Sequence, residues 1–303
     1  MSGPLTFGLD LGGTKCLGVA WSDGEVVAQH RAETDTADPG DVIELLAGVV
    51  QQLRAASGEP SAIGVGAPGL VTADGDLARA PNLPGVQDLA LRRRLSKSAG
   101  LPVVVENDAA AAAWAEFSCG AAAEAGSMLA VTLGTGVGGG IVLDGQLLRG
   151  AHGFAAEIGH MTVREGGRPC VCGKRGCWEA YASGAALGRL AREGLALSGE
   201  ALTAAAIRGE AEALVLLNEY AGEVALGLGS LVEILDPEMV VIGGGLVEVG
   251  DALLAPVRSA LPRFVYSWEH RTPTPVVAAQ LGERSGAIGA ALLAAALLVG
   301  ERS

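Results

Sequence analysis

The sequence predicts an α/β protein built from two related lobes, and three observations favour this. The chain has 303 residues, 50% of them hydrophobic, which is enough to bury more than one core. It opens with three short apolar segments, at 5–9, 16–21 and 25–29, separated by glycine turns. A similar unit returns further along the chain, with 128–133 as its first strand. There Gly13, Thr14, Gly18, Asp23 and Gly24 align with Gly134, Thr135, Gly139, Asp144 and Gly145.

Local composition indicates where turns and helices lie. The dipeptide Asp23-Gly24 is typical of a two-residue hairpin between strands. Alanine-rich tracts at 109–113, 121–123 and 204–206 favour helices, because alanine has the highest helix propensity. Cys16 and Cys119 stand apart from the other cysteines, and we expect both to be small buried apolar residues.

Charge and hydropathy narrow the range of partners. The formal net charge of −13 disfavours binding to nucleic acid or to an anionic membrane surface. The N-terminus has neither the basic nor the apolar region of a leader, and the most apolar run, 287–300, is shorter than the ~20 residues of a span. We therefore expect a cytoplasmic protein with small-molecule partners. Clustered cysteines in that compartment suggest metal or redox chemistry rather than disulfides.

Two glycine-rich segments follow apolar strands and are candidate phosphate loops, "DLGGTK" at 10–15 and "LGTGVGGG" at 133–140. Glycines let backbone N–H groups close around phosphate oxygens. A P-loop is excluded, because Thr14 and Lys15 stand in the wrong order and a strand follows. The pattern G-x-G-x-x-G occurs at 64–69 and 134–139, but neither match opens a helix, so a dinucleotide fold is not favoured.

The segment "VVVENDAAAAAW" places Asn107 and Asp108 between a predicted strand and a helix. In one interpretation, either residue only caps the helix. In the other, Asp108 accepts the proton of an attacking hydroxyl, while Asp10, at another strand end, lies near a magnesium ion.

Three cysteines within eight residues indicate a metal site. Cys170, Cys172 and Cys177 form C-x-C-x4-C, and His160 precedes them, which gives a Cys3His set suited to tetrahedral zinc. Unligated thiols in such a loop would invite oxidation, which disfavours the alternative of free cysteines. Four protein ligands leave no position for water, so the zinc is expected to be structural.

Two glutamates flank this cluster, Glu157 three residues before His160 and Glu179 two residues after Cys177. A bound metal would bring the two carboxylates together. Carboxylates accept hydrogen bonds from paired hydroxyl groups, which is what a sugar presents.

In their order along the chain these motifs resemble the ROK family of sugar kinases, most closely its bacterial glucokinases. The resemblance rests on "DLGGTK", "GVGAPG", "APNLPG", "ENDA", "TLGTGVGGG", "GAHGFAAEIGH", "CVCGKRGCWEAYASG" and "VIGGG". It implies an actin/hexokinase-like (ribonuclease H-like) duplicated fold with two lobes around a central cleft. The small lobe would be 1–118 with a C-terminal helix at about 283–303, and the large lobe 119–282 with the zinc-binding loop.

The resemblance also implies a role for each matching residue. Asp108 would be the catalytic base, and the sugar would bind Asn82, Asn107, Asp108, Glu157, His160 and Glu179. One ring nitrogen of His160 would bind zinc and the other would face the sugar. Asp10 would lie on the magnesium side, and nucleotide and phosphates would bind Gly12, Gly13, Thr14, Lys15, Gly134, Thr135, Gly136, Gly243 and Gly244. Val171 departs from the glycine that many members carry there, a change we expect to be tolerated.

The implied activity is transfer of the ATP γ-phosphate, with Mg²⁺, to the 6-hydroxyl of glucose, an entry step of glycolysis. Alternatives within the family are kinases of N-acetylmannosamine, N-acetylglucosamine, fructose or mannose, or a non-catalytic sugar-binding regulator. The donor could also be ADP or polyphosphate. A repressor would need a helix-turn-helix domain ahead of the first strand, and an acyl-phosphate kinase would leave the Cys3His set unexplained. Dimers are usual in the family, so the resemblance implies a homodimer or a dimer of dimers.

Overall fold

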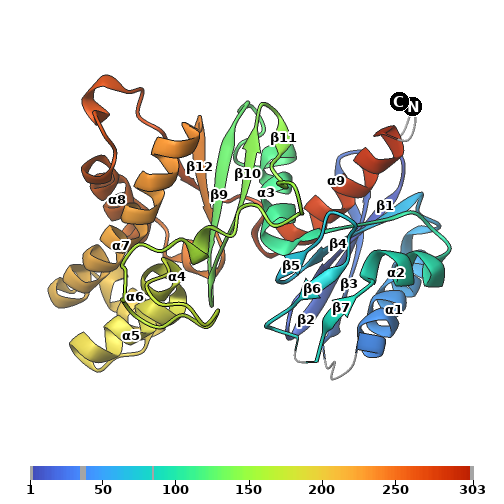
Figure 1. Cartoon of the computed structure of the whole chain (residues 1–303), viewed down its shortest axis with the longest axis horizontal. Coiled ribbons are helices and arrows are strands. Elements are labelled where there is room, and N and C mark those ends of the chain that lie inside the picture. Colours follow the sequence, from blue (N-terminus) through green and yellow to red (C-terminus); the bar gives the residue numbers. More distant parts are fainter. Residues whose placement is uncertain (1–2, 35–38, 84, 301–303) are drawn as a thin grey trace.

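The computed structural model describes residues 3–34, 39–83 and 85–300, and two five-stranded sheets organise it (Figure 1). In the first sheet the order is β3-β2-β1-β4-β8. Its strands are β1 (Thr6–Leu11), β2 (Lys15–Ser22), β3 (Glu25–Glu33), β4 (Ala62–Ala67) and β8 (Val103–Asn107). β1 runs antiparallel to β2 and parallel to β4, and β4 runs parallel to β8.

The second sheet repeats this arrangement in the order β11-β10-β9-β12-β13. Its strands are β9 (Met128–Leu133), β10 (Val137–Leu143), β11 (Gln146–Leu147), β12 (Met239–Gly243) and β13 (Val276–Ala278). β9 is antiparallel to β10 and parallel to β12, as β1 is to β2 and β4. The duplication and the α/β class predicted from the sequence are confirmed.

The hairpin turns of the two sheets are also equivalent. Asp23 and Asp144 have φ of 53° and 49°, and Gly24 and Gly145 follow with φ of 84° and 73°. Two successive residues with positive φ make the type I′ turn that matches the twist of paired strands. Asp-Gly at these two positions therefore specifies both hairpins.

Further elements complete each half of the molecule. In the first half, a separate three-stranded sheet has the order β5 (Leu70–Val71), β6 (Leu77–Arg79) and β7 (Gln87–Leu89), and the helices are α1 (Pro39–Ser57) and α2 (Leu91–Ala99). The second half contains α4 (Glu179–Ala182), α5 (Gly184–Leu195), α6 (Gly199–Ile207), α7 (Ala211–Leu235) and α8 (Asp251–Ala260). Short 3-10 turns are η1 (Ile158–His160), η2 (Gly245–Val249), η3 (Leu261–Phe264), η4 (Trp268–His270) and η5 (Gly282–Arg284). Separate apolar cores lie beneath the two sheets.

Two helices, α3 (Asp108–Cys119) and α9 (Ser285–Gly300), lie between the sheets (Figure 1). α9 crosses β1 and β4 at their paired residues Gly8 and Gly64. A Cβ at Gly64 would overlap the carbonyl oxygen of Ala290 in α9, and one at Gly8 would overlap that of Ala287. These glycines let the helix rest directly on strand backbone.

The apolar character of α9 follows from this packing. By length and composition, the stretch Gly282–Gly300 could cross a membrane, which exceeds our expectation for the run at 287–300. Its buried residues contact the first sheet and α3, so protein packing accounts for its hydrophobicity.

Two expectations about the end of α3 are wrong. Cys119 is exposed rather than buried, and 121–123 forms turns instead of helix. The helix ends at Gly120, and the carboxylate of Glu116 accepts the backbone N–H of Ala121, which stabilises the turn. Cys16 is buried, as expected.

The contact between α9 and β4 can be tested with Gly64→Ala. We expect the free energy of unfolding to fall by about 3 kcal/mol or more, because the added Cβ meets helix backbone that cannot move alone. Urea unfolding measures this. Gly48→Ala is the matched control, since a Cβ there meets open space within α1 and should stabilise the protein by about 0.5–1 kcal/mol. Equal effects of the two substitutions would contradict the packing argument.

Candidate active site and metal centre

Asn107 and Asp108 lie where β8 ends and α3 begins. The Asn107 side chain caps the helix by accepting the N–H of Ala110 at 3.0 Å, and its amide donates to the carbonyl of Gly69 at 3.1 Å. Asp108 accepts the N–H of Ala109 through one oxygen at 2.8 Å. The capping interpretation therefore holds for Asn107, whose side chain also hydrogen-bonds Asp108, while Asp108 opens the first turn of α3.

Asp10 and Asp108 form an electrostatically strained pair. Burial raises the pKa of Asp10 to about 7; the nearby Asp108 raises it further, and Lys15 opposes the shift. Burial also raises the pKa of Asp108 to about 6, against the hydrogen bond from Ala109, and the charge of Glu157 adds to the rise. Two desolvated carboxyl groups that repel one another are suited to sharing a proton or a cation.

The ammonium group of Lys15 pairs with an acid outside the glycine turn that it follows. Its Nζ lies 3.1 Å from Glu283 in η5, and Arg31 of β3 lies 2.6 Å from the same carboxylate. All three side chains are exposed by half or more, so this link is a surface ion-pair network between the first sheet and the start of α9.

The first glycine turn joins β1 to β2 and lies beside Asn82. The N–H of Gly12 donates to the carbonyl of Lys15 at 2.9 Å, which closes the turn and leaves Thr14 exposed. A Cβ at Gly13 would come within 2.7 Å of the Asn82 carbonyl oxygen. Within residues 3–34, 39–83 and 85–300, Asn82 has no hydrogen bond to the other predicted sugar residues; Pro84, in the same motif, lies outside these ranges.

The second glycine turn joins β9 to β10. Gly134 donates to the carbonyl of Gly136 at 3.0 Å and accepts the N–H of Gly184, at the start of α5, at 2.7 Å. At the end of β12, Gly243 pairs with Thr132, and the next residue, Gly244, packs with φ of 82° against the backbone of β9. The structure thus brings the predicted nucleotide stretch 243–244 to the side of this turn.

Glu179 connects the second glycine turn to the cysteine cluster. One carboxylate oxygen accepts the N–H of Val137 at 3.0 Å, and the other lies 3.4 Å from the sulfur of Cys170. A Cβ at Gly136 would overlap the Glu179 carboxylate. The glycine therefore allows the acid to reach the turn.

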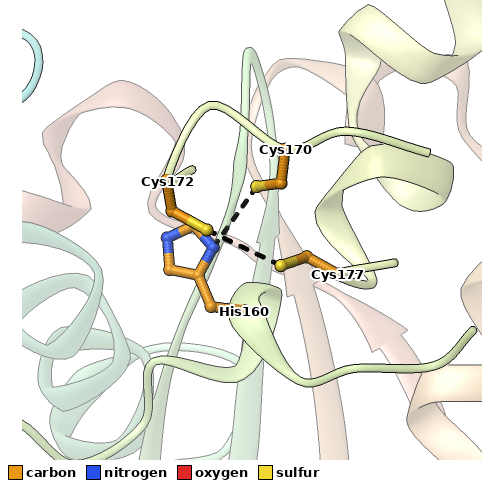
Figure 2. A group of neighbouring side chains, drawn as sticks. All are labelled: His160, Cys170, Cys172 and Cys177. Carbon is orange, nitrogen blue, oxygen red and sulfur yellow. Dashed lines mark hydrogen bonds between the residues drawn. The ribbon is translucent and has the colours of Figure 1, made fainter. Parts of the chain in front are cut away.

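His160, Cys170, Cys172 and Cys177 converge on one point, as Figure 2 shows. Their four donor atoms lie within 4.8 Å of one another. The Sγ atoms of Cys172 and Cys177 are 3.7 Å apart, and Nδ1 of His160 is 3.7 Å from Sγ of Cys170. Zn–S bonds of about 2.3 Å around a tetrahedron place two sulfurs about 3.8 Å apart, so the donor set fits such an ion.

The thiols of this cluster differ in how readily they ionise, because against the effect of burial hydrogen bonds lower the pKa of Cys172. Burial raises the pKa of the Cys170 thiol to about 12. A thiol in that state is a poor ligand, and a bound metal would reverse the shift by stabilising the thiolate.

The two nitrogens of His160 face different partners. Nδ1 points toward Cys170, and Nε2 lies 4.0 Å from a carboxylate oxygen of Glu157. Burial raises the pKa of Glu157, with His160 opposing and Glu179 adding to the rise. One nitrogen of the imidazole thus points toward the cysteine cluster, and the other lies near Glu157.

Two residues that sequence reasoning left without a role also meet here. Nε of Arg149 lies 2.6 Å from Oε2 of Glu106, a side chain only 8% exposed. Glu106 stands next to Asn107 in a motif already singled out, but its partner is 43 positions away. Nothing in the sequence around either residue indicates this pairing.

The comparisons agree on one family. The chain matches the ROK family over residues 6–296. A glucokinase of Streptomyces coelicolor is 38% identical, covering 96% of this chain and 97% of that protein, and an N-acetylmannosamine kinase of Salmonella typhi is 35% identical over 95% and 98%. The crystal structure of a ROK family glucokinase from Streptomyces griseus in complex with glucose and AMPPNP has a TM-score of 0.84 and 35% identity, covering 96% of this chain and 99% of its own. The actin/hexokinase-like fold is confirmed, and this chain belongs to the ROK family.

Proposed function

We propose that the protein is an ATP-dependent glucokinase, a sugar kinase that transfers the γ-phosphate of ATP to the 6-hydroxyl of glucose. The observation that carries this is Asp108, a partly buried carboxyl group just after a strand end, which interacts electrostatically with Asp10 and Glu157. Full-length similarity to glucokinases, one of them solved with glucose and an ATP analogue, supports the substrate and the donor.

In this mechanism Asp108 accepts the proton of the sugar hydroxyl, whose oxygen then attacks phosphorus in line. A pKa of about 6 leaves Asp108 mostly ionised at neutral pH and still basic enough for the task. Glu157, His160 and Glu179 would hold the other hydroxyls, with the side chain of Asn107. We also assign Asn82 to the sugar, on family resemblance alone.

The phosphates would lie between the two glycine turns. The residues proposed for this role are Gly12, Gly13, Thr14, Lys15, Gly134, Thr135 and Gly136, with Gly243 and Gly244 toward the nucleoside. Asp10 would face the magnesium ion, which supplies positive charge to the transferring phosphoryl group. Exposed backbone N–H groups in such turns suit phosphate oxygens.

The Cys3His cluster would hold a structural Zn²⁺ through Nδ1 of His160 and the thiolates of Cys170, Cys172 and Cys177. With all four positions taken by protein, the ion organises rather than reacts. It would fix the imidazole so that Nε2 serves the sugar.

We also propose lobe boundaries, a cellular location and an oligomeric state. The small lobe would comprise 1–118 and about 283–303, and the large lobe 119–282; residues 1–2, 35–38, 84 and 301–303 lie outside the described structure. We place the protein in the cytoplasm, in glycolysis, and expect a homodimer or a dimer of dimers.

A second candidate is an N-acetylmannosamine kinase, favoured by the 35% identity to the Salmonella enzyme. The same base and phosphate turns would serve it. What separates the two is the side chain opposite the sugar 2-position.

Purified protein with ATP and Mg²⁺ should release ADP fastest with glucose, compared with mannose, fructose, N-acetylglucosamine and N-acetylmannosamine. Asp108→Asn should lower kcat by about 10²–10⁴-fold with little change in glucose affinity. Asp144→Asn, in an exposed hairpin turn, is the control. For the native enzyme, kcat/KM should rise with pH through about 6, as Asp108 ionises. A preference for an acetamido sugar would overturn the substrate, and no turnover at all would overturn the enzyme.

The strain on Asp10 should appear in stability as a function of pH. Because its folded-state pKa is raised to about 7, the folded protein binds the extra proton, and ionisation destabilises it as pH rises from about 4 through 7. Asp10→Asn should therefore be more stable than the native protein at pH 8 without Mg²⁺, on the order of 1–3 kcal/mol, and similar at pH 4. Urea unfolding at both pH values tests this, with the exposed Asp74→Asn as control. A stability gain independent of pH would contradict it.

The metal assignment predicts about one zinc per chain by elemental analysis. Cys172→Ser should lose the metal and lower the Tm by at least about 5 °C, because the loop then lacks its ligand set. Cys119→Ser, which removes an exposed thiol away from the cluster, should do neither. A metal-free protein of unchanged Tm would refute the site.

A further inference from the structure

An ion pair between a buried acid and a half-exposed arginine joins the two halves of the site, and its members have no part in the function assigned above. Nε of Arg149 lies 2.6 Å from Oε2 of Glu106. Glu106 belongs to β8 of the first sheet, whereas Arg149 follows β11 of the second. The carboxylate is 8% exposed and the guanidinium 46%, so a nearly buried acid receives its charge partner from the other half of the molecule.

Through its second oxygen, Glu106 also accepts a hydrogen bond at the end of β8, next to the proposed base. Oε1 accepts the backbone N–H of Asn107 at 3.1 Å, directly before Asp108. One carboxylate therefore holds both the base-bearing segment and Arg149. A partner lost from a carboxylate this buried leaves an uncompensated charge, which the surrounding backbone must move to relieve.

Arg149 is bonded in turn to the loop that leads to the sugar residues. Its carbonyl accepts the N–H of Ala155 at 3.1 Å, which closes the segment 149–155 upon itself. Glu157 follows two residues later and His160 three beyond that. Glu157 is thus eight residues and His160 eleven residues along the chain from Arg149.

The same loop is docked on the first half by its backbone. The carbonyl of His152 accepts the N–H of Ala73 at 3.0 Å, and Gly153 packs against Val71. These contacts hold the loop against β5 and the turn that follows it. The ion pair adds a charge-assisted contact to these backbone contacts, because a guanidinium group donates to a carboxylate in a fixed geometry.

We propose that Arg149 is a positioning residue for sugar binding: held by Glu106, it fixes the loop 149–157 so that Glu157 and His160 face Asp108. This rests on the proposed kinase function. The residue does not touch substrate. It fixes the position of the acids on one half of the molecule relative to the base on the other half. A displacement of about 1 Å between these groups would slow the reaction.

The test is Arg149→Gln, with glucose affinity measured by calorimetry without ATP and with kcat and KM measured in parallel. We expect Kd and KM for glucose to rise at least about tenfold, while kcat at saturating glucose falls much less. Arg149→Lys should recover part of the affinity by keeping the charge. Arg258→Gln is the matched control, because its guanidinium is similarly exposed (42%) and pairs with Asp251 away from the site.

A double-mutant cycle separates positioning from general destabilisation. If Arg149 acts through the loop, Arg149→Gln and Glu157→Gln should be non-additive in glucose affinity, whereas Arg258→Gln and Glu157→Gln should add. Should Arg149→Gln fail to fold, Glu106→Gln removes the charge pair while keeping an acceptor for the N–H of Asn107.

Unchanged glucose affinity in folded Arg149→Gln, or strict additivity with Glu157→Gln, would overturn the inference and leave the kinase intact. A native protein that neither binds nor phosphorylates any sugar would overturn both. Sugar binding without turnover would remove the kinase function, and the calorimetric cycle would still decide the role of Arg149.

Discussion

Contact of helix α9 with bare strand backbone is the constraint on which both halves of the molecule depend. Gly8 and Gly64 pair across β1 and β4, and the helix carbonyls lie directly on them. On its other side, Gly289 brings α9 equally close to Ala111 of α3. Because α3 begins at Asp108, the glycines that set these helix distances also set the position of the proposed base relative to the first sheet.

That close packing creates the electrostatic tension of the site. Asp10 lies beside the start of α9 and near Asp108, where partial burial reduces the screening of the two carboxylates by water. The raised pKa values of both acids are the result. The fold tolerates an arrangement that costs stability without a cation, a pattern common where charge must be bound or moved. In the cysteine cluster, burial likewise raises the pKa of Cys170, and a bound metal ion would stabilise its thiolate.

Features encoded close together in sequence were predictable, and those that depend on distant partners were not. Asp23-Gly24 fixes a turn through its own backbone preference, and C-x-C-x4-C with His160 is a ligand set readable by spacing. The exposure of Cys119 depends on where Gly120 ends the helix, which alanine propensity did not reveal. The pairing of Glu106 with Arg149 joins separate halves of the molecule, so the local sequence around either residue does not predict it.

The sequence by itself determined the duplicated strand-turn-strand units, the family and the metal-ligand set, because each is encoded by residues within one short segment or repeated at fixed spacing. Tertiary structure alone decided that Glu179 reaches the second glycine turn, that Lys15 pairs with Glu283 rather than standing free, and that Glu106 links the two halves. These contacts form only when the sheets take their places around α3 and α9. Their distances come from packing, which no local pattern specifies.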